Sequence, residues 1–157
     1  MAAAVDRCVI LSFEGVEMMD ASFADEVFAS LAAERGHRRP HPGCLALKGL
    51  NSTSRDNLQL ALLSRPTREP GLRNCVLPVF RGAADVEFVG KTEEHVRSTL
   101  EILRAKRQLT ARELAEMLRL DIAAASTRLK VVFDLGLGCR RETRDPHGRV
   151  YVYEWLV

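Results

Sequence analysis

Asp20 and Ser22, in the stretch MMDASFAD, stand where an apolar run gives way to a helical pattern. Either side chain is suited to cap a helix, because its oxygen accepts a hydrogen bond from an unpaired amide of the first turn. A serine at a helix start also has a second chemistry, since a phosphate on its hydroxyl would lie beside free amides and the positive end of the helix dipole. The residues therefore predict a helix start at which Ser22 either only caps or is also a phosphoacceptor, with Asp20 beside it.

A second group of candidate side chains is basic and lies close to the C-terminus, in the stretch CRRETRDPHGRV. Arginines on a hairpin can contact the phosphates or the minor groove of DNA. Upstream, residues 122–135 have helical spacing, and their polar face would meet the bases if this helix entered a major groove. The alternative is a solvated hairpin on a domain that binds protein. The candidate DNA-binding residues are Ser126, Thr127, Arg128, Lys130, Arg140, Arg141, Arg144 and Arg149.

Other chemistries have weaker support in the sequence. His37, His41 and Cys44 suggest metal ligands, but no fourth ligand accompanies them, so we predict no metal site. Phosphate-binding glycine loops, zinc-protease motifs and nucleophile elbows are missing, which predicts a protein that is not an enzyme and needs no cofactor. The four cysteines are far apart and form no C-x-x-C pair, so we expect reduced, buried thiols.

The composition is that of a globular protein. The 157 residues suffice for one domain or two small ones, and they contain neither a long apolar run nor a secretory signal. We therefore expect a cytoplasmic protein without a membrane segment. Residues 91–157 hold 13 basic and 10 acidic residues, which is a weak indication of a polyanionic partner.

Two strand-helix units are predicted in the first half. Cys8 to Phe13 form a continuous apolar run, typical of a strand buried on both faces, and a helix follows as far as Gly36. The second unit has a strand at residues 44–50, a cap-rich turn NSTSRD and a helix at residues 57–64. Two such units in succession imply parallel strands and an α/β sheet.

These residues resemble a known family. A strand that leads into MMDASFADEVF, followed by LALKGLNSTSRDNLQLALL, is similar to a STAS-type domain (sulphate transporter and anti-sigma-factor antagonist) over about residues 6–65. In the antagonists of this family, a serine at the start of this helix is phosphorylated by a partner kinase of the histidine-kinase-like ATPase fold. The resemblance places that position at Ser22.

Residues 65–74 are rich in proline, glycine and arginine and predict a loop. CVLPVF and DVEFVG are two short β-like runs after it. We expect them to form a hairpin that completes the first domain, with an interdomain linker as the alternative.

From Thr92 onward the pattern is helical. One helix is followed by LTARELAEML, in which Thr110 and Glu113 have the spacing of a capping box, and then by the helix at residues 122–135. A strand, the turn at residues 145–148 and a second strand complete the chain. Three helices followed by a β-hairpin resemble the winged helix-turn-helix of bacterial regulators.

The sequence thus predicts an α/β protein of two domains. Residues 1–90 would form a small STAS-like domain of sheet and helices, and residues 91–157 a mostly α winged-helix domain. The predicted function is regulatory, in which the first domain senses a protein partner and the second binds DNA. The alternative is a signalling adaptor that does not bind DNA. The oligomeric state stays open, a homodimer included.

Overall fold

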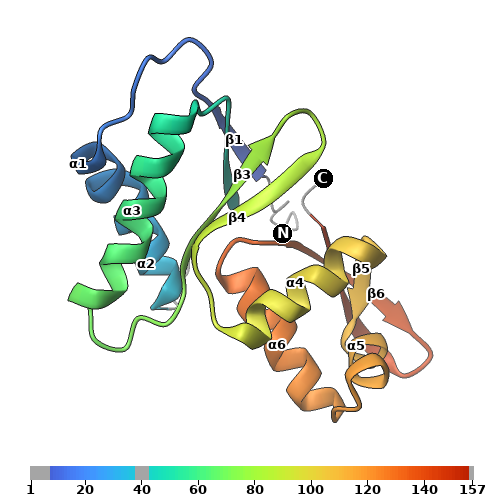
Figure 1. Cartoon of the computed structure of the whole chain (residues 1–157). Coiled ribbons are helices and arrows are strands. Elements are labelled where there is room, and N and C mark those ends of the chain that lie inside the picture. Colours follow the sequence, from blue (N-terminus) through green and yellow to red (C-terminus); the bar gives the residue numbers. More distant parts are fainter. Residues whose placement is uncertain (1–7, 38–42, 156–157) are drawn as a thin grey trace, which may run out of the picture.

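The computed structural model describes residues 8–37 and 43–155 and has mixed α/β architecture (Figure 1). Its first half contains β1 (Cys8–Ser12), α1 (Ala21–Phe23), the π-helix η1 (Ala24–Ala29), α2 (Ser30–Gly36), β2 (Cys44–Lys48), α3 (Ser52–Arg68), β3 (Cys75–Arg81) and β4 (Asp85–Lys91). Its second half contains α4 (Glu94–Lys106), β5 (Gln108–Thr110), α5 (Ala111–Leu118), α6 (Ile122–Asp134), β6 (Cys139–Asp145) and β7 (Gly148–Glu154).

The first sheet has the strand order β1-β2-β3-β4. β1 and β2 are parallel over five register pairs, which confirms the two predicted strand-helix units. β3 and β4 form an antiparallel hairpin, and β3 joins β2 in parallel through Leu47 and Val79. The hairpin therefore completes the sheet, and the linker alternative for these residues is wrong.

β1 lies at the edge of this sheet, and our prediction of a strand buried on both faces is wrong. Val9 is 54% exposed and Ile10 47%. An apolar run identifies a strand, but the run alone does not say whether neighbours cover it. Among the described residues β1 pairs with β2 alone, so fewer neighbouring side chains cover its faces than cover those of an inner strand.

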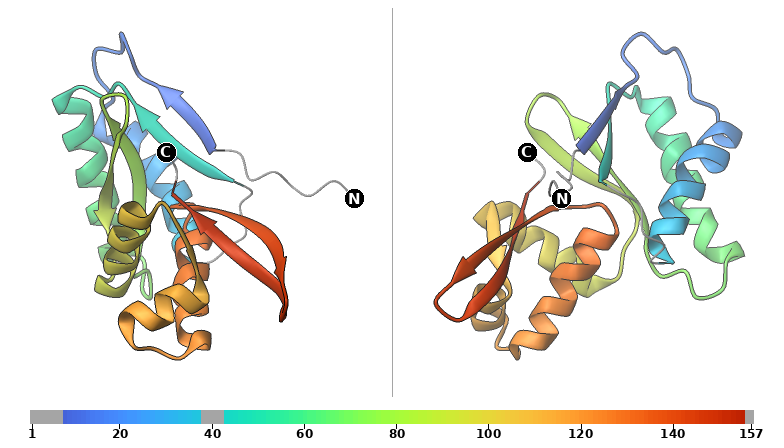
Figure 2. Two further views of the ribbon diagram at one scale, coloured as in Figure 1. Left: turned by 90° about the vertical axis from the view of Figure 1, so that its right-hand side faces the viewer. Right: turned by 180° about the vertical axis from the view of Figure 1, so that it is seen from behind.

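The helices of the first half cover one face of the sheet, as two further views show (Figure 2). α1, η1 and α2 follow one another without a break and pack beside α3. Their shared core contains Phe28, Leu58 and Leu62 together with Leu47 and Leu77 of the sheet. α3 is longer than predicted, because Asn51 caps it at the start of the expected turn and it runs through Pro66.

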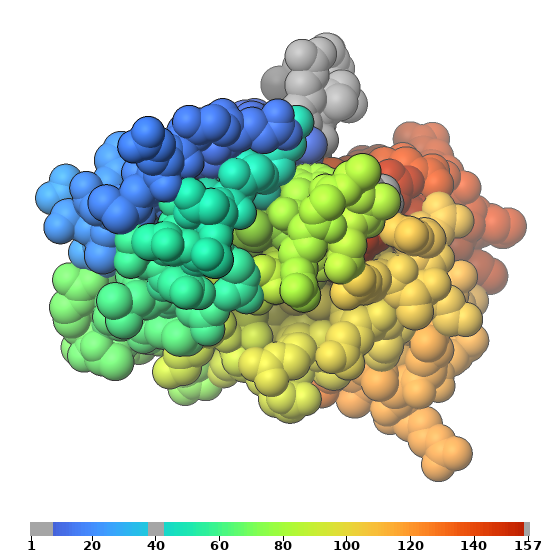
Figure 3. Space-filling view, turned by 45° about the horizontal axis from the view of Figure 1, so that its top comes forward, coloured from blue at the N-terminus to red at the C-terminus, as the bar shows by residue number. Residues whose placement is uncertain are grey.

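The opposite face of the β3-β4 hairpin packs against the second half of the chain. Val76 and Val86 are buried in the same core as Leu100, Leu103 and Leu129, and Phe80 and Phe88 pack against it. The space-filling view shows the hairpin between the N-terminal and C-terminal surfaces (Figure 3). The two halves therefore share buried apolar surface through the hairpin.

In the second half, α4, α5 and α6 accompany a three-stranded sheet of order β5-β7-β6. The capping box of Thr110 and Glu113 is present at α5, and Asp121 caps α6 by accepting a hydrogen bond from Ala124 N at 2.7 Å. These observations confirm the predicted starts of α5 and α6. The sequence pattern did not reveal β5, because a strand of three residues has no periodicity of its own.

Candidate functional site

Asp20, and not Ser22, caps the first helix. Its Oδ1 accepts a hydrogen bond from Phe23 N at 2.8 Å, so Ser22 is the second residue of α1. The side chain of Ser22 is exposed and has no hydrogen-bond partner in the described part of the chain. The sequence left the capping residue open between the two, and the structure assigns it to Asp20. The Ser22 hydroxyl is therefore available for another role.

The segment before this helix is held by side chains from the second strand-helix unit. Asn51 Nδ2 donates to the Glu17 carbonyl oxygen at 2.6 Å, and Asn57 Nδ2 donates to that of Met19 at 2.9 Å. The Ser54 hydroxyl accepts a hydrogen bond from Met19 N at 2.9 Å. Residues 16–20 thus have a fixed backbone although they have no regular secondary structure.

Asn51 has two functions at once. Its Oδ1 accepts from Ser54 N at 2.8 Å and caps α3, while its Nδ2 holds the preceding loop. Sequence reasoning interpreted NSTSRD only as a turn rich in capping residues and missed this second contact. The available signal was the density of Asn and Ser, whose side chains frequently bond to backbone groups.

Exposed apolar side chains lie close to Ser22 in the chain, on both sides of it. Met18 is 58% exposed and Phe23 48% exposed, although the Phe23 ring also contacts Phe28 edge to face at a centroid distance of 5.9 Å. Val16 and Val27 extend the same group, at 43% exposed each. Val16, Met18, Ser22, Phe23 and Val27 are called the Ser22 surface below. Apolar groups gathered on a surface are typical of a site where another protein binds.

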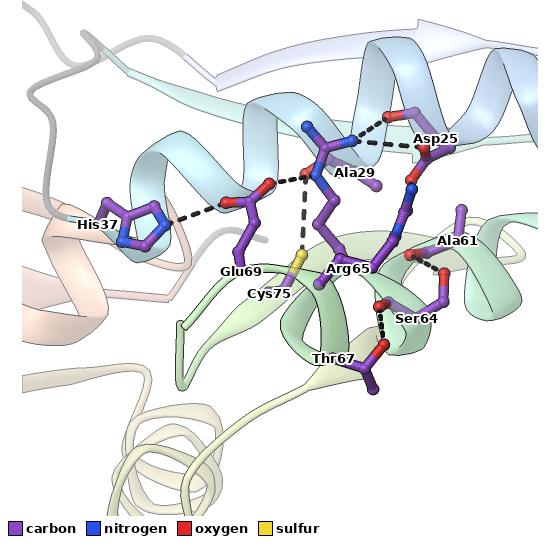
Figure 4. Close-up of polar contacts among 10 residues, drawn as sticks. Asp25, Ala29, His37, Ala61, Ser64, Arg65, Thr67, Glu69 and Cys75 are labelled. Carbon is purple, nitrogen blue, oxygen red and sulfur yellow. Dashed lines mark hydrogen bonds and ion pairs between the residues drawn. The ribbon is translucent and has the colours of Figure 1, made fainter. Parts of the chain in front are cut away.

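Ion pairs join η1 to α3 (Figure 4). The Asp25 carboxylate is 2.5 Å from Arg68 Nη2 and 3.4 Å from Arg65 Nη1. Arg65 Nε also donates to Glu69 at 2.5 Å, and the other oxygen of Glu69 is 3.0 Å from His37 Nε2. Principally the hydrogen bond from Arg68 lowers the pKa of Asp25 below its usual range. The network ties Asp25, near the start of the continuous run α1-η1-α2, and His37, at its end, to α3 and to Glu69, the residue after α3.

The π-helical segment η1 lies within this run. A π-helix contains a wider turn than an α-helix and is often found where a protein functions. Here Cys75 Sγ of β3 approaches the Ala29 carbonyl oxygen at 3.8 Å. η1 thus contributes Val27 to the Ser22 surface and contacts β3 through Ala29.

The predicted residues of α6 are placed on its exposed side with one exception. Ser126, Thr127 and Lys130 are exposed, whereas Arg128 is half-buried. The Thr127 hydroxyl donates to the Ala123 carbonyl oxygen at 3.0 Å, and Lys130 Nζ is 2.6 Å from an Asp134 carboxylate oxygen. The face therefore has less free positive charge than its sequence indicates.

Three of the four predicted hairpin arginines have intramolecular partners. The Arg140 guanidinium lies over the rings of Phe133 and Tyr151, at 4.1 and 4.4 Å from their centroids. Arg141 Nε is 2.5 Å from a Glu154 oxygen, and Arg149 Nε is 2.9 Å from a Glu142 oxygen. Arg144 is exposed and has no ion pair with any residue that the structure describes. Exposed pairs of this kind are weak, so the paired arginines remain able to exchange partners.

The structure brings some of these predicted residues together and keeps others apart. Ser126 and Arg149 line one hollow of about 290 Å³ between α6 and the β6-β7 hairpin, with Ile122 and Tyr151. Arg140 points instead to the aromatic rings described above. The hollow is the place where α6 and the hairpin could contact one ligand.

A further hollow of about 800 Å³ lies at the carboxyl ends of β1 and β2. Such ends of parallel strands often bind ligands in α/β proteins. Its cations are already paired here: Arg55 lies 2.5 Å from Glu87, Arg81 3.7 Å from the same carboxylate, and Lys48 3.7 Å from Glu14. This pairing weighs against an anion site.

The predicted absence of a metal involves a residue that is not described. His41 lies outside the described residues, while His37 contacts Glu69 and Cys44 Sγ contacts Cys8 Sγ. Across residues 8–37 and 43–155, no three His, Cys, Asp or Glu side chains gather as metal ligands would. In the same ranges, no helix has the length and apolar character needed to cross a membrane.

Comparison with known proteins supports the resemblance for part of the chain. Residues 2–39 match the model of a family described as a STAS-like domain of unknown function, DUF4325. The matched range contains the Ser22 surface. A search of curated proteins finds no match. The family match suggests a regulatory or partner-switching role for the first half, since STAS-like domains typically mediate contacts between proteins.

Proposed function

We propose that this protein is a regulatory protein whose first half, residues 1–90, binds a protein partner through the Ser22 surface. The observation that carries the proposal is the position of Ser22. Its hydroxyl is exposed, is not needed as the helix cap, and has exposed apolar side chains before and after it in the chain. Such a surface binds a partner by burying apolar area, and a charge added to it would oppose that burial. The role is binding and not catalysis.

Phosphorylation of Ser22 would supply the switch. A phosphate adds between one and a half and two negative charges at neutral pH. At the second residue of a helix it would be tolerated by the fold, because the helix dipole favours negative charge there. In the proposed system the kinase is a partner with the histidine-kinase-like ATPase fold, as the STAS resemblance implies.

The test compares Ser22→Ala, Ser22→Asp and a matched control, Ala123→Asp. Ala123 is exposed and is the second residue of α6, behind the aspartate cap Asp121, so it repeats the local position of Ser22 in the other half. We expect Ser22→Ala and Ala123→Asp to retain a partner recovered from cell extract, and Ser22→Asp to lose it. Equal recovery with Ser22→Asp would leave Ser22 without a regulatory role.

Phosphorylation itself is tested separately. The recovered partner is incubated with the full-length protein and labelled ATP, and the modified peptide is mapped by mass spectrometry. We expect label on the peptide containing Ser22 and none on the Ser22→Ala variant. Label on another serine, or its absence with an active ATPase, would contradict the switch while leaving the binding proposal to the first test.

For the second half, residues 91–157, we propose a winged helix that binds DNA. The observation that favours this is the order of elements, in which three helices precede the β6-β7 hairpin. In addition, Ser126, Thr127 and Lys130 of α6 are exposed. Arg128, Arg140, Arg141, Arg144 and Arg149 are the remaining candidates for contact with DNA.

Salt dependence tests the DNA proposal. Binding of the full-length protein to its own upstream DNA is measured by polarisation at several salt concentrations. Arg144→Ala should weaken binding to every sequence and reduce the slope of log K against log salt by about one, as expected for one lost phosphate contact. Arg97→Ala, at an exposed position of α4, is the control and should change neither the affinity nor the slope. Absence of binding at low salt would favour the adaptor alternative.

A further inference from the structure

Cys8 and Cys44 are the first residues of β1 and β2 and are register partners in the parallel pair. Their Sγ atoms are 2.8 Å apart. A covalent disulfide has an S–S length of about 2.05 Å, so a movement of less than an ångström would bring the sulfurs to bonding distance. Adjacent strands are also separated by about 4.8 Å, which suits the Cα spacing that disulfides require.

Arg35 of α2 lies beside this pair and is only 4% exposed. Its Nη2 donates to the Gly43 carbonyl oxygen at 3.3 Å, whereas Nε and Nη1 have no hydrogen-bond partner among the described residues. No carboxylate among the described residues forms an ion pair with Arg35. A buried cation without an anion is costly, so a negative group is expected next to it.

A side chain at Gly136 would disturb the guanidinium. A Cβ atom placed on Gly136 would lie 2.5 Å from Arg35 Nη1, so the glycine leaves the space that the arginine fills. Gly136 also has a φ of +70°, which a residue with a side chain rarely adopts. The second half of the chain therefore closes over Arg35 and keeps its charge away from solvent.

The two thiols are not equivalent. The hydrogen bond between the two sulfurs lowers the pKa of Cys8, and the Arg35 charge acts in the same direction against the effect of burial. The same hydrogen bond, together with burial, raises the pKa of Cys44. Cys8 is also half-buried whereas Cys44 is buried. A small oxidant would therefore meet Cys8 first, which is the more accessible and the more readily deprotonated of the two thiols, with Cys44 behind it.

We propose that Cys8 and Cys44 are a peroxide-sensitive modification site that closes reversibly into a disulfide between β1 and β2. The Cys8 thiolate attacks one oxygen of hydrogen peroxide, the O–O bond breaks, and the products are a Cys8 sulfenic acid and hydroxide. The Cys44 sulfur then attacks the Cys8 sulfur and water leaves, with the Cys44 proton. In total, the two sulfurs lose two electrons, and the peroxide becomes one water and one hydroxide, which forms a second water with the proton that Cys8 released on ionisation. A dithiol reductant reverses the step.

The other cysteines provide internal comparisons. Cys75 is buried on the helix-covered side of the sheet, and burial raises its pKa to about 12, so it should not react. Cys139 is half-buried, and its charge contributes to raising the pKa of Cys44. Cys139 is therefore the competing thiol for Cys44.

The experiment uses the reduced full-length protein with one equivalent of hydrogen peroxide. Free thiols are then blocked with N-ethylmaleimide, and the protein is digested without reduction for mass spectrometry. We expect one linked peptide pair, containing Cys8 and Cys44, that disappears after dithiothreitol, while Cys75 remains a free thiol. A bond between Cys44 and Cys139, or oxidation of Cys8 only to sulfinic acid, would overturn the proposal.

Variants separate the two roles of the pair. Cys44→Ser should prevent the disulfide and trap the Cys8 sulfenic acid, detected as a dimedone adduct, whereas Cys8→Ser should give neither product. Arg35→Met should slow alkylation of Cys8 at neutral pH, by roughly tenfold for each unit by which the pKa of that thiol rises.

Because Arg35→Met risks unfolding the protein, the pH profile of iodoacetamide alkylation is also measured on the unaltered chain. Cys8 should react with a midpoint below that of the same cysteine in urea-unfolded protein. Identical midpoints in the folded and unfolded states would contradict the assignment of Cys8 as the thiolate.

Discussion

Phe88 of β4 and Trp155, which follows β7, meet edge to face, with ring centroids 5.4 Å apart and an interplanar angle of 81°. The contact joins the hairpin of the first half to the end of the second. Edge-to-face pairs contribute about 0.5–1.5 kcal/mol beyond the area they bury. The two halves should therefore be coupled in stability through this pair.

A double-mutant cycle measures this coupling. Phe88→Leu and Trp155→Leu should each lower the free energy of unfolding measured in urea. The double variant should lose less than the sum of the two single losses, by about 0.5–1.5 kcal/mol. Phe13→Leu, which alters the Phe13–Phe28 contact in the other core, is the control partner for Trp155→Leu. That pair should be additive, and equal coupling in both cycles would contradict a specific contact.

Asp20 and Ser22 should differ in their effect on stability. Asp20→Ala removes the helix cap and should cost about 1 kcal/mol, the typical value for a lost N-cap. Ser22→Ala removes no hydrogen bond from the described residues and should stay within a few tenths of the parent. Thermal unfolding followed by circular dichroism compares them. The reverse order would mean that Ser22 is the cap.

Ser54→Ala should loosen the loop before the first helix. Met19 is 3% exposed and its amide donates to the Ser54 hydroxyl, so the variant leaves a buried donor unpaired, at a cost of about 1–3 kcal/mol. Amide hydrogen exchange of Met19 should become faster. Exchange in the middle of α3 should accelerate only by the amount that the loss of global stability causes. Thr53→Ala, at an exposed neighbouring position, is the control.

The ion pairs of Asp25 predict a loss of stability in acid. The Arg68 hydrogen bond lowers the pKa of Asp25 in the folded state, so the folded protein binds fewer protons than the unfolded chain. The stabilisation is complete above the ordinary aspartate pKa of about 3.9 and is lost as pH falls through the lower, folded value. The stability difference between parent and Asp25→Asn should therefore shrink in acid.

Urea unfolding at several pH values measures that difference. Glu26→Gln is the control, since Glu26 is exposed and has no ion pair with a described residue. A pH dependence of the same size for both variants would show that Asp25 is not the responsible carboxylate.

Much of the fold was predictable, because its elements are local. The capping box of Thr110 and Glu113 depends on residues three apart, and the helical stripe of α6 depends on spacing alone. The exposure of Val9 and the partners of Arg149 were not predictable. The first depends on which strand lies at the sheet edge, and the second on the register of β6 against β7, which places Glu142 beside it.

The site was predictable in part for the same reason. Asp20 and Ser22 were identified from their place before a helical pattern, but which of them caps is a matter of backbone geometry. Arg35 gave no signal, because its environment is assembled from β1, β2 and the turn after α6. Residues that meet only in the folded chain leave no local pattern in the sequence.

The double use of Asn51 has a consequence for the order of folding. Its amide holds the Glu17 carbonyl oxygen, which is 34 residues earlier in the chain, and Asn57 holds that of Met19 from a separation of 38. Contacts between such distant residues form only after the intervening loop has closed. During synthesis from the N-terminus, residues 16–20 must therefore wait until Asn57 has left the ribosome and α3 has docked. The surface around Ser22 is complete only after that step, so a nascent chain cannot present it early.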